Sequence, residues 1–360
     1  MTEKKIRYLV TTSDESTWKF DRPVIFLGEW CRLYDRRHIW ENMDAIVAEP
    51  YGVDRVSKDL NAAQASEFED TIFPKLCTSL NHYHGKQYSQ RFWKIILGHW
   101  LSLHLSVILN RVKTLEQCLQ KYQISGTTFF RSDDFSFTAD CFSSSLSNFD
   151  DNQWNNILNE KILNLLEMNI PFVENIDYHS SIEPSRVRPS FSRVFSKWAH
   201  KYIGLFLSFF IRDNDAFIIN SYLPLKEEVK LHLALRQLPQ FWSESNFKSQ
   251  NRPNSMIRHQ LAKDLTSESK DSLMEIISSM LFELMPVCFL EDFSNLNNFS
   301  KKQRWPKNPK FIFTSSNFFA DDVFKLWTAN KVESGTKYYI GQHGNNNGTL
   351  KSLIGGELRK

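Results

Sequence analysis

Short apolar runs alternate with longer helical patterns along this chain. Residues 6–12 (IRYLVTT) predict a strand. Residues 23–30 (PVIFLGEW) contain a continuous apolar run closed by glycine, which is typical of a strand buried on both faces of a sheet. The segment that follows, residues 36–49 (RRHIWENMDAIVAE), predicts a helix. The chain therefore begins with two strands and a helix, the start of an α/β unit.

Helical patterns dominate the middle of the chain, and we expect a large helical insertion at about residues 61–200. From residue 61 to about residue 123 the apolar positions repeat with the period of a helix. Residues 126–152 are polar and rich in Ser and Phe, which predicts a loop. Residues 154–169 predict an amphipathic helix.

The last third of the chain gives the clearest prediction. Residues 215–224 predict a strand that ends in a turn, and a helix stopped by Pro239 follows. A strand at 311–314, a helix at about 320–332 and a strand at 338–340 make a βαβ unit, which requires parallel strands. We therefore predict an α/β fold with a Rossmann-like parallel sheet, helices on both faces and a large helical insertion.

Composition and charge indicate what kind of protein this is and which partners it can be expected to bind. The chain has 360 residues and is 41% hydrophobic, so it can bury a large core. Its 44 basic and 41 acidic residues nearly balance, which gives no electrostatic reason to expect a nucleic-acid partner. The five cysteines lack metal-ligand spacing and the N-terminus lacks a signal-peptide pattern. We expect a cytoplasmic protein with reduced thiols.

Three polar turns follow predicted strands, at residues 28–30, 315–317 and 341–344. Ligands of open α/β sheets bind beyond the carboxyl ends of the strands, and glycine lets the backbone approach a ligand closely. His343, in the third turn, could act as a general base or donate to a phosphate, or it could only cap the turn. Glu29 could serve as an acid or base, or it could pair with Arg32.

Other stretches have weaker chemical signals. His82 and His84 are two residues apart without a third ligand nearby, so we expect no metal site. Arg91 could bind a phosphate or be an ordinary solvated arginine. The basic and aromatic segment 185–201 could dock on anionic lipid, or it could be a solvated helix face. No nucleotide-binding P-loop, serine-hydrolase or zinc-protease motif is present in the sequence.

Four stretches, at residues 11–45, 80–101, 221–242 and 317–348, resemble a family of transferases encoded in bacterial surface-polysaccharide (O-antigen) loci. The motifs LGEWC, RFWKIILG and IGQHG carry the resemblance. It implies a glycosyltransferase-like protein of the GT-B type, which is built from two Rossmann-like domains. The family pattern falls on these positions: Gly28, Glu29, Trp30, His84, Ser89, Arg91, Trp93, Gly98, Tyr222, Leu223, Pro224, Gln237, Pro239, Glu291, Asn317, Phe318, Phe319, Gly341, Gln342, His343 and Gly344.

The resemblance implies transfer of a sugar from a nucleotide-sugar to a lipid-linked or glycan acceptor at the cytoplasmic face of the membrane, without a metal or other cofactor. We expect His343 and Glu29 to be catalytic. The expected substrate-binding residues are Gly28, Trp30, His84, Arg91, Asn317, Gly341, Gln342 and Gly344.

The division into domains is a further expectation. We expect residues 1–348 to form the acceptor-side domain and residues 349–360 to begin a second domain, which another polypeptide could supply. The alternatives are a non-catalytic truncated homologue that binds glycan or a partner chain, and a membrane-peripheral scaffold.

Overall fold

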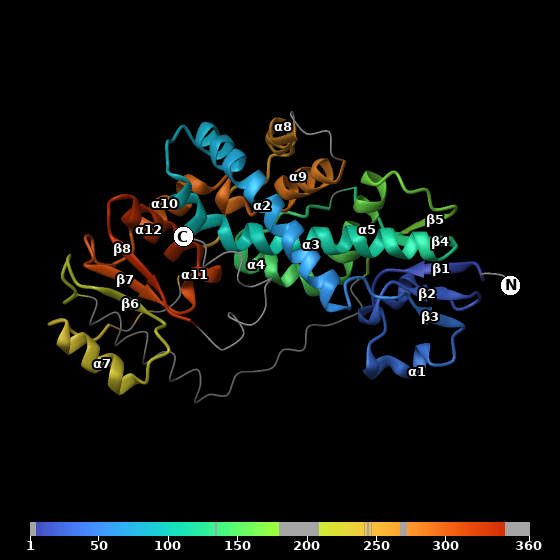
Figure 1. Cartoon of the computed structure of the whole chain (residues 1–360), viewed down its shortest axis with the longest axis horizontal. Coiled ribbons are helices and arrows are strands. Elements are labelled where there is room, and N and C mark those ends of the chain that lie inside the picture. Colours follow the sequence, from blue (N-terminus) through green and yellow to red (C-terminus); the bar gives the residue numbers. More distant parts are fainter. Residues whose placement is uncertain are drawn as a thin grey trace.

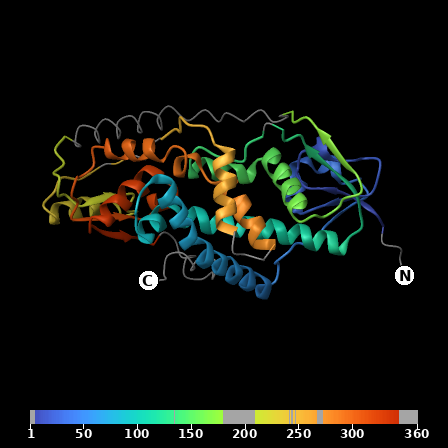
Figure 2. The same cartoon turned by 90° about the horizontal axis from the view of Figure 1, so that it is seen from above.

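Two parallel β-sheets lie at opposite ends of an elongated molecule, with helices between them (Figure 1). The structure is a computed structural model, and it describes residues 5–133, 135–179, 209–240, 242, 245, 247–266 and 272–342. Seen from above, the sheets again occupy the two ends of the long axis (Figure 2). The α/β class with parallel strands is confirmed.

The first sheet has the strand order β3-β2-β1-β4-β5. All of its neighbouring strands are parallel, and Leu9 of β1 lies between Ile25 of β2 and Thr127 of β4. This order matches strands 3-2-1-4-5 of the Rossmann fold, and it reverses direction between β1 and β4. The strands are β1 (Arg7–Val10), β2 (Val24–Phe26), β3 (Ala45–Val47), β4 (Ile124–Phe130) and β5 (Val173–Ile176).

The second sheet has the order β6-β7-β8 and is also parallel. Its strands are β6 (Phe217–Ile219), β7 (Phe311–Thr314) and β8 (Lys337–Ile340). The short helix α11 (Asn317–Ala320) and helix α12 (Asp322–Glu333) connect β7 to β8. The predicted βαβ unit is confirmed, and Gly335 in its last turn has a φ of 93°, which favours glycine.

Two predicted elements were wrong. The helix predicted at 36–49 ends early, as α1 (Arg37–Trp40), and its second half contains β3. The loop predicted at 126–152 contains most of β4, the central partner of β1. Both strands are stabilised by pairing with residues far away in the sequence, and strand propensity depends strongly on such context. The strands also form two sheets, because β6, β7 and β8 pair only with one another among the described residues.

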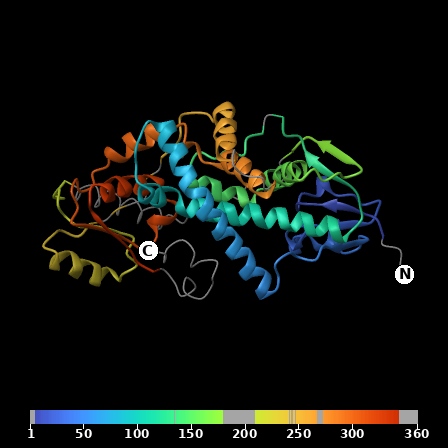
Figure 3. The same cartoon turned by 45° about the horizontal axis from the view of Figure 1, so that its top comes forward.

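Two long helices connect the ends of the molecule. Helix α2 (Arg55–His84) ends at Gly85, whose φ of 60° allows the chain to turn back into α3 (Gln90–Lys121). Helix α3 contacts α12 at the second sheet and α5 (Asn152–Leu165) at the first. Figure 3 shows α2 crossing over α3. Helix α3 is long and apolar enough to cross a membrane, but most of its apolar stretch is buried inside the protein, as expected of a core helix.

The remaining described helices surround this pair. They are α4 (Phe142–Ser147), α7 (Leu225–Ala234), α8 (Ser255–Thr266), α9 (Ser272–Leu284) and α10 (Phe293–Lys301). Short 3₁₀ turns lie at Glu15–Thr17, Glu29–Cys31, Tyr34–Arg36, Asn148–Asp150 and Val287–Phe289. The five cysteines are free, as predicted.

A buried ion pair within helix α12 contacts the segment that follows the first sheet. Asp322 and Lys325, in the first turn of α12, have almost fully buried side chains, and the ammonium nitrogen of Lys325 lies 2.7 Å from a carboxylate oxygen of Asp322. The second carboxylate oxygen of Asp322 accepts a hydrogen bond from the backbone N–H of Phe142, at 2.8 Å. Phe142 begins α4, which follows β4 of the first sheet. A hydrogen bond from the segment after β4 to a buried, ion-paired carboxylate thus helps to hold the two sheets in position.

Candidate functional site

The carboxyl ends of both sheets are turned toward the middle of the molecule. Phe142, in the segment after β4, and Phe319, in the helix after β7, have ring centroids 5.3 Å apart. Figure 1 shows the same arrangement, with the two sets of strand ends on the inner sides of the two sheets. Because open α/β sheets bind ligands beyond the carboxyl ends of their strands, these two edges form the candidate site.

The second-sheet edge brings polar groups from three strand ends together. Asn220, after β6, donates its side-chain amide N–H to the side-chain oxygen of Asn317, after β7, at 2.7 Å. The hydroxyl of Ser315 donates to the carbonyl of Ser221 at 3.0 Å. A Cβ atom at Gly341, after β8, would lie 2.3 Å from the Ser315 hydroxyl, so this close approach requires glycine. The predicted residues Asn317 and Gly341 therefore do lie at one edge.

The backbone at this edge is strained. Asn220 has a φ of 46° and Tyr222 a φ of 59°, in the left-handed region that non-glycine residues rarely adopt. Backbone strain of this kind clusters at functional sites. Tyr222 is also 63% exposed, so its ring is open to solvent beside the strand ends.

The third predicted turn is described only in part. The backbone N–H of Gly341 donates to the carbonyl of Thr314 at 2.8 Å, which continues the pairing of β7 and β8, and the next residue, Gln342, is exposed. His343 and Gly344 lie outside the described residues. The roles predicted for them stay predictions. The domain boundary predicted at 348 lies outside the described residues as well.

The first-sheet edge is built around a folded-back tryptophan. The indole N–H of Trp30, after β2, donates to the carbonyl of Thr11, after β1, at 3.2 Å. A Cβ atom at Gly28 would lie only 2.0 Å from the Trp30 ring, so glycine is needed for this fold-back. The guanidinium of Arg111, from the C-terminal half of α3, lies 5.5 Å from the centroid of the same ring.

Arg111 is the most informative residue that sequence analysis missed. Its side chain donates to the side-chain oxygen of Asn155 at 3.2 Å, and it has no carboxylate partner in the described part of the chain. Burial lowers the pKa of its guanidinium, although arginine stays charged at neutral pH. A largely desolvated charge without a counter-charge is unfavourable by itself, and a bound anion would offset that cost.

The side chain of Asn156, the residue after the Arg111 partner Asn155, connects the ends of β1 and β4, where the strand order reverses. The side-chain amide of Asn156 donates to the hydroxyl of Thr11 at 3.0 Å and to the carbonyl of Thr128 at 3.1 Å. Its oxygen accepts from the backbone N–H of Phe130 at 2.7 Å. The buried hydroxyl of Thr12 has no hydrogen-bond partner among the described residues. In Rossmann folds ligands bind at this reversal.

Glu29 has the partner that the sequence offered as an alternative. Arg32 donates to both of its carboxylate oxygens, at 2.7 and 2.8 Å. The hydrogen bond from Arg32 lowers the pKa of Glu29, and its side chain is mostly exposed. Glu29 is therefore ionised at neutral pH and is a poor proton donor.

Two other predicted residues lie away from both edges. The ring of His84, at the end of α2, packs on Phe293 with centroids 4.4 Å apart, and one of its nitrogens lies 3.1 Å from the carbonyl of Phe289. Burial lowers its pKa to about 4. Arg91 is exposed in the first turn of α3, next to Ser89, which bonds to Glu333 at the far end of α12.

A pocket of about 640 Å³ opens at the segment that follows β4, beside α5. Glu160 lines it, and burial, helped by the nearby charge of Asp133, raises the pKa of its carboxyl group. Lys161 and Glu283 form an ion pair on the same wall. A half-buried carboxyl group in a pocket with a raised pKa is suited to acid–base chemistry. The sequence pattern here predicts only an amphipathic helix.

Metal-ligating residues do not gather in the described ranges: no group of three or more His, Cys, Asp and Glu side chains there could hold a metal ion. The two edges and the pocket offer hydrogen-bonding side chains, one arginine without a carboxylate partner in the described part of the chain, and one carboxyl group with a raised pKa. That set is suited to binding a polar, anionic ligand.

Comparison with known proteins gives one result. The model of the LIC12162 family, a family of transferases, matches residues 7–358 and so includes both sheets. No curated protein and no solved structure matches the chain.

Proposed function

Since the chain belongs to the LIC12162 family of transferases, we propose that the group it transfers is a sugar. The donor is a nucleotide-sugar and the acceptor a lipid-linked or soluble glycan of a bacterial surface polysaccharide, O-antigen or capsule. In this reaction an acceptor hydroxyl oxygen bonds to the anomeric carbon. The bond from that carbon to the nucleotide phosphate breaks, the nucleotide leaves, and a protein base takes the hydroxyl proton.

The observation that supports this proposal best is the pair of parallel sheets with facing carboxyl ends. A two-substrate transfer needs two binding surfaces that meet, and binding at strand ends is the general rule for such sheets. The first-sheet edge supplies Arg111, which suits a phosphate group. The second-sheet edge supplies hydrogen-bonding side chains such as Asn317. We assign the role of base to His343 and keep Glu160 as the alternative.

The reaction would take place at the cytoplasmic face of the membrane, where lipid-linked acceptors can be reached. The proposed membrane contact through residues 185–201 lies outside the described residues. So do residues 349–360, which were expected to begin a second domain. The rival function is that of a homologue that binds a glycan or a partner chain without catalysis.

Calorimetric titration of the full chain with CMP-, UDP- and GDP-sugars tests the proposal. We expect micromolar binding of one nucleotide class and at least tenfold weaker binding in Arg111→Gln, because a charge-assisted hydrogen bond to phosphate is lost. Arg91→Gln is the matched control, since it removes the same charge from the exposed start of the same helix. Weaker binding in Arg91→Gln, but not in Arg111→Gln, would favour the interpretation made from the sequence.

Catalysis needs its own measurement. We expect release of free nucleotide in the presence of acceptor, lost in His343→Ala while donor binding is kept. If the chain binds a nucleotide-sugar but neither His343→Ala nor Glu160→Gln changes the rate, both assignments of the base are wrong. If no nucleotide-sugar binds, the non-catalytic rival is favoured.

A further inference from the structure

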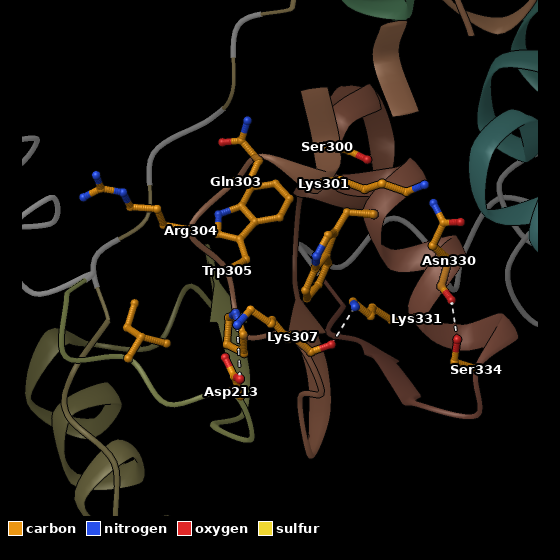
Figure 4. Close-up of a pocket in the computed structure, with 13 residues that line it drawn as sticks. Asp213, Ser300, Lys301, Gln303, Arg304, Trp305, Lys307, Asn330, Lys331 and Ser334 are labelled. Atoms are coloured by element: carbon orange, nitrogen blue, oxygen red, sulfur yellow. Dashed lines mark hydrogen bonds and ion pairs between the residues drawn. The ribbon is translucent and has the colours of Figure 1, made fainter. Parts of the chain in front are cut away.

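A second pocket, of about 520 Å³, lies at the opposite edge of the second sheet from the strand-end site (Figure 4). Asp213 precedes β6, Lys307 precedes β7 and Ser334 precedes β8, and all three line the pocket. Because the strands are parallel, their amino ends share one edge, and the carboxyl ends lie at the other. The pocket is therefore separate from the proposed transfer site.

The lining is strongly cationic. Four basic side chains, Lys301, Arg304, Lys307 and Lys331, line the pocket together with one carboxylate, that of Asp213. Lys307 lies 3.4 Å from Asp213, so this carboxylate is already engaged. The ammonium group of Lys331 donates to the carbonyl of Lys307, as Figure 4 shows. Neither Lys301 nor Arg304 has a carboxylate partner among the described residues, and both are exposed.

Helix ends do not offset this charge. Helices α10 and α12 both finish at the pocket, and lysines are favourable near the negative end of a helix dipole. Each helix end counts for about half a negative charge at most. Two ends and Asp213 therefore sum to roughly two negative charges against four positive ones, and a net positive pocket remains. Cations held together in this way attract an anion.

Neutral donors are present in the same place. The indole rings of Trp305 and Trp327 line the pocket, with centroids 5.2 Å apart in an edge-to-face arrangement. No hydrogen bond from either indole N–H to an acceptor is observed in the described part of the chain. An oxyanion with several oxygens can accept from cationic and neutral donors together. The volume also exceeds that of a bare phosphate and leaves room for the group that carries it.

We propose that this pocket is a binding site for a phosphate group, carried either by a small soluble ligand or by a lipid head group. Arg304 and Lys301 contact its oxygens from the open side, and Lys331 and the two indole N–H groups contact them from the inner wall. The inference does not depend on the proposed glycosyl transfer, because no residue is shared between the two sites.

Fluorine NMR of the full chain labelled with 5-fluorotryptophan tests this inference. Trp305→Phe and Trp327→Phe variants identify the two signals. Inorganic pyrophosphate, titrated to about 10 mM so that even a 1 mM site would be filled, is expected to shift both signals. In Lys301→Gln/Arg304→Gln the midpoint is expected to rise at least tenfold, because two contacts between charged groups are removed. Lys302→Gln/Lys310→Gln is the matched control. Both lysines are exposed and lie outside the lining of the pocket, and replacing them removes the same amount of positive charge.

A second experiment distinguishes a lipid head group from a soluble ligand. Vesicles of phosphatidylglycerol and, separately, of phosphatidylcholine are sedimented with the protein. Binding to the first kind of vesicle alone, lost in Lys301→Gln/Arg304→Gln, indicates a lipid head group. A pyrophosphate response without vesicle binding indicates a soluble ligand. If neither probe binds, or if the double variant and its control behave alike, the inference is wrong. Arg111→Gln, which affects the strand-end site, is expected to leave both results unchanged.

Discussion

His104 gives the most quantitative prediction, because its burial has a direct consequence for stability at low pH. The side chain is 1% exposed, one ring nitrogen lies 2.9 Å from the carbonyl of Trp100, and the ring packs among aromatic side chains. Burial lowers its pKa from 6.5 to about 4. Near neutral pH the ring is uncharged in both the folded and the unfolded chain, so its titration has no effect there.

As the pH falls below 6.5 the unfolded chain binds a proton that the folded protein resists, and stability is lost until the folded-state pKa is passed. From these two pKa values, we expect the free energy of unfolding to fall by about 2 kcal/mol between pH 7 and pH 5, and by about 3 kcal/mol by pH 4. Urea unfolding at these pH values measures this change. We expect His104→Gln to lose about 2 kcal/mol less than the parent protein between pH 7 and pH 5.

The comparison concerns the change with pH, so it is unaffected by any packing that the substitution disturbs. Exposed His38, replaced in the same way, is the control and is expected to follow the parent. If parent and His104→Gln lost the same free energy on acidification, the folded protein would accommodate a charged His104, and the burial argument would fail. The same test applied to His84 would separate a core histidine from the substrate contact predicted from the sequence.

Three further predictions concern the site and the joint between the sheets. Gly28→Ala should displace Trp30, because the Trp30 ring lies 2.0 Å from the position of the new Cβ. The loss of the hydrogen bond and the cation–π contact of Trp30 should lower the free energy of unfolding by about 2 kcal/mol, and tryptophan fluorescence should shift. Asp322→Asn should cost about 3 kcal/mol or more in thermal unfolding, because Lys325 is left as an unpaired buried charge, and adding Lys325→Met should recover most of it. Glu160→Gln should be more stable than the parent at about pH 8 but not at about pH 4, since a raised carboxyl pKa makes the ionised form unfavourable in the folded state. An unchanged fluorescence spectrum of Gly28→Ala would contradict the first prediction. The second would be contradicted if the destabilisation of the Asp322→Asn/Lys325→Met variant were the sum of those of the two single variants. The third would be contradicted if the stability difference between Glu160→Gln and the parent did not change with pH.

The site was predictable only as far as strand ends could be located. Residues 311–314 and 338–340 were identified as strands, so the turns that contain Asn317 and Gly341 were assigned correctly to one edge. The predicted strand at 23–30 likewise located Gly28, Glu29 and Trp30 at the end of β2. What these residues bond to could not be known from the sequence. Glu29 could have faced a ligand as easily as Arg32, and only the fold decided between them.

Arg111 and Glu160 show the limit most clearly. Both lie on helices with ordinary amphipathic patterns, and nothing in their neighbouring residues distinguishes them from solvated charges. Their properties come from burial by segments distant in the chain, Trp30 and Asn155 for Arg111, and the segment after β4 for Glu160. Burial is a property of the assembled structure, and it changes the cost of a charge far more than local sequence does.

The sequence by itself determined the parallel α/β class, the long helices and the βαβ unit, because periodicity of apolar residues and turn residues act over short distances. Only the tertiary structure decided that the strands form two sheets and that their carboxyl ends face each other. It also decided that β3 and β4 exist where a helix and a loop were predicted. Strand pairing, desolvation of charges and the hydrogen bond from Phe142 to Asp322 all depend on contacts between residues far apart in the chain, and a linear pattern does not specify such contacts.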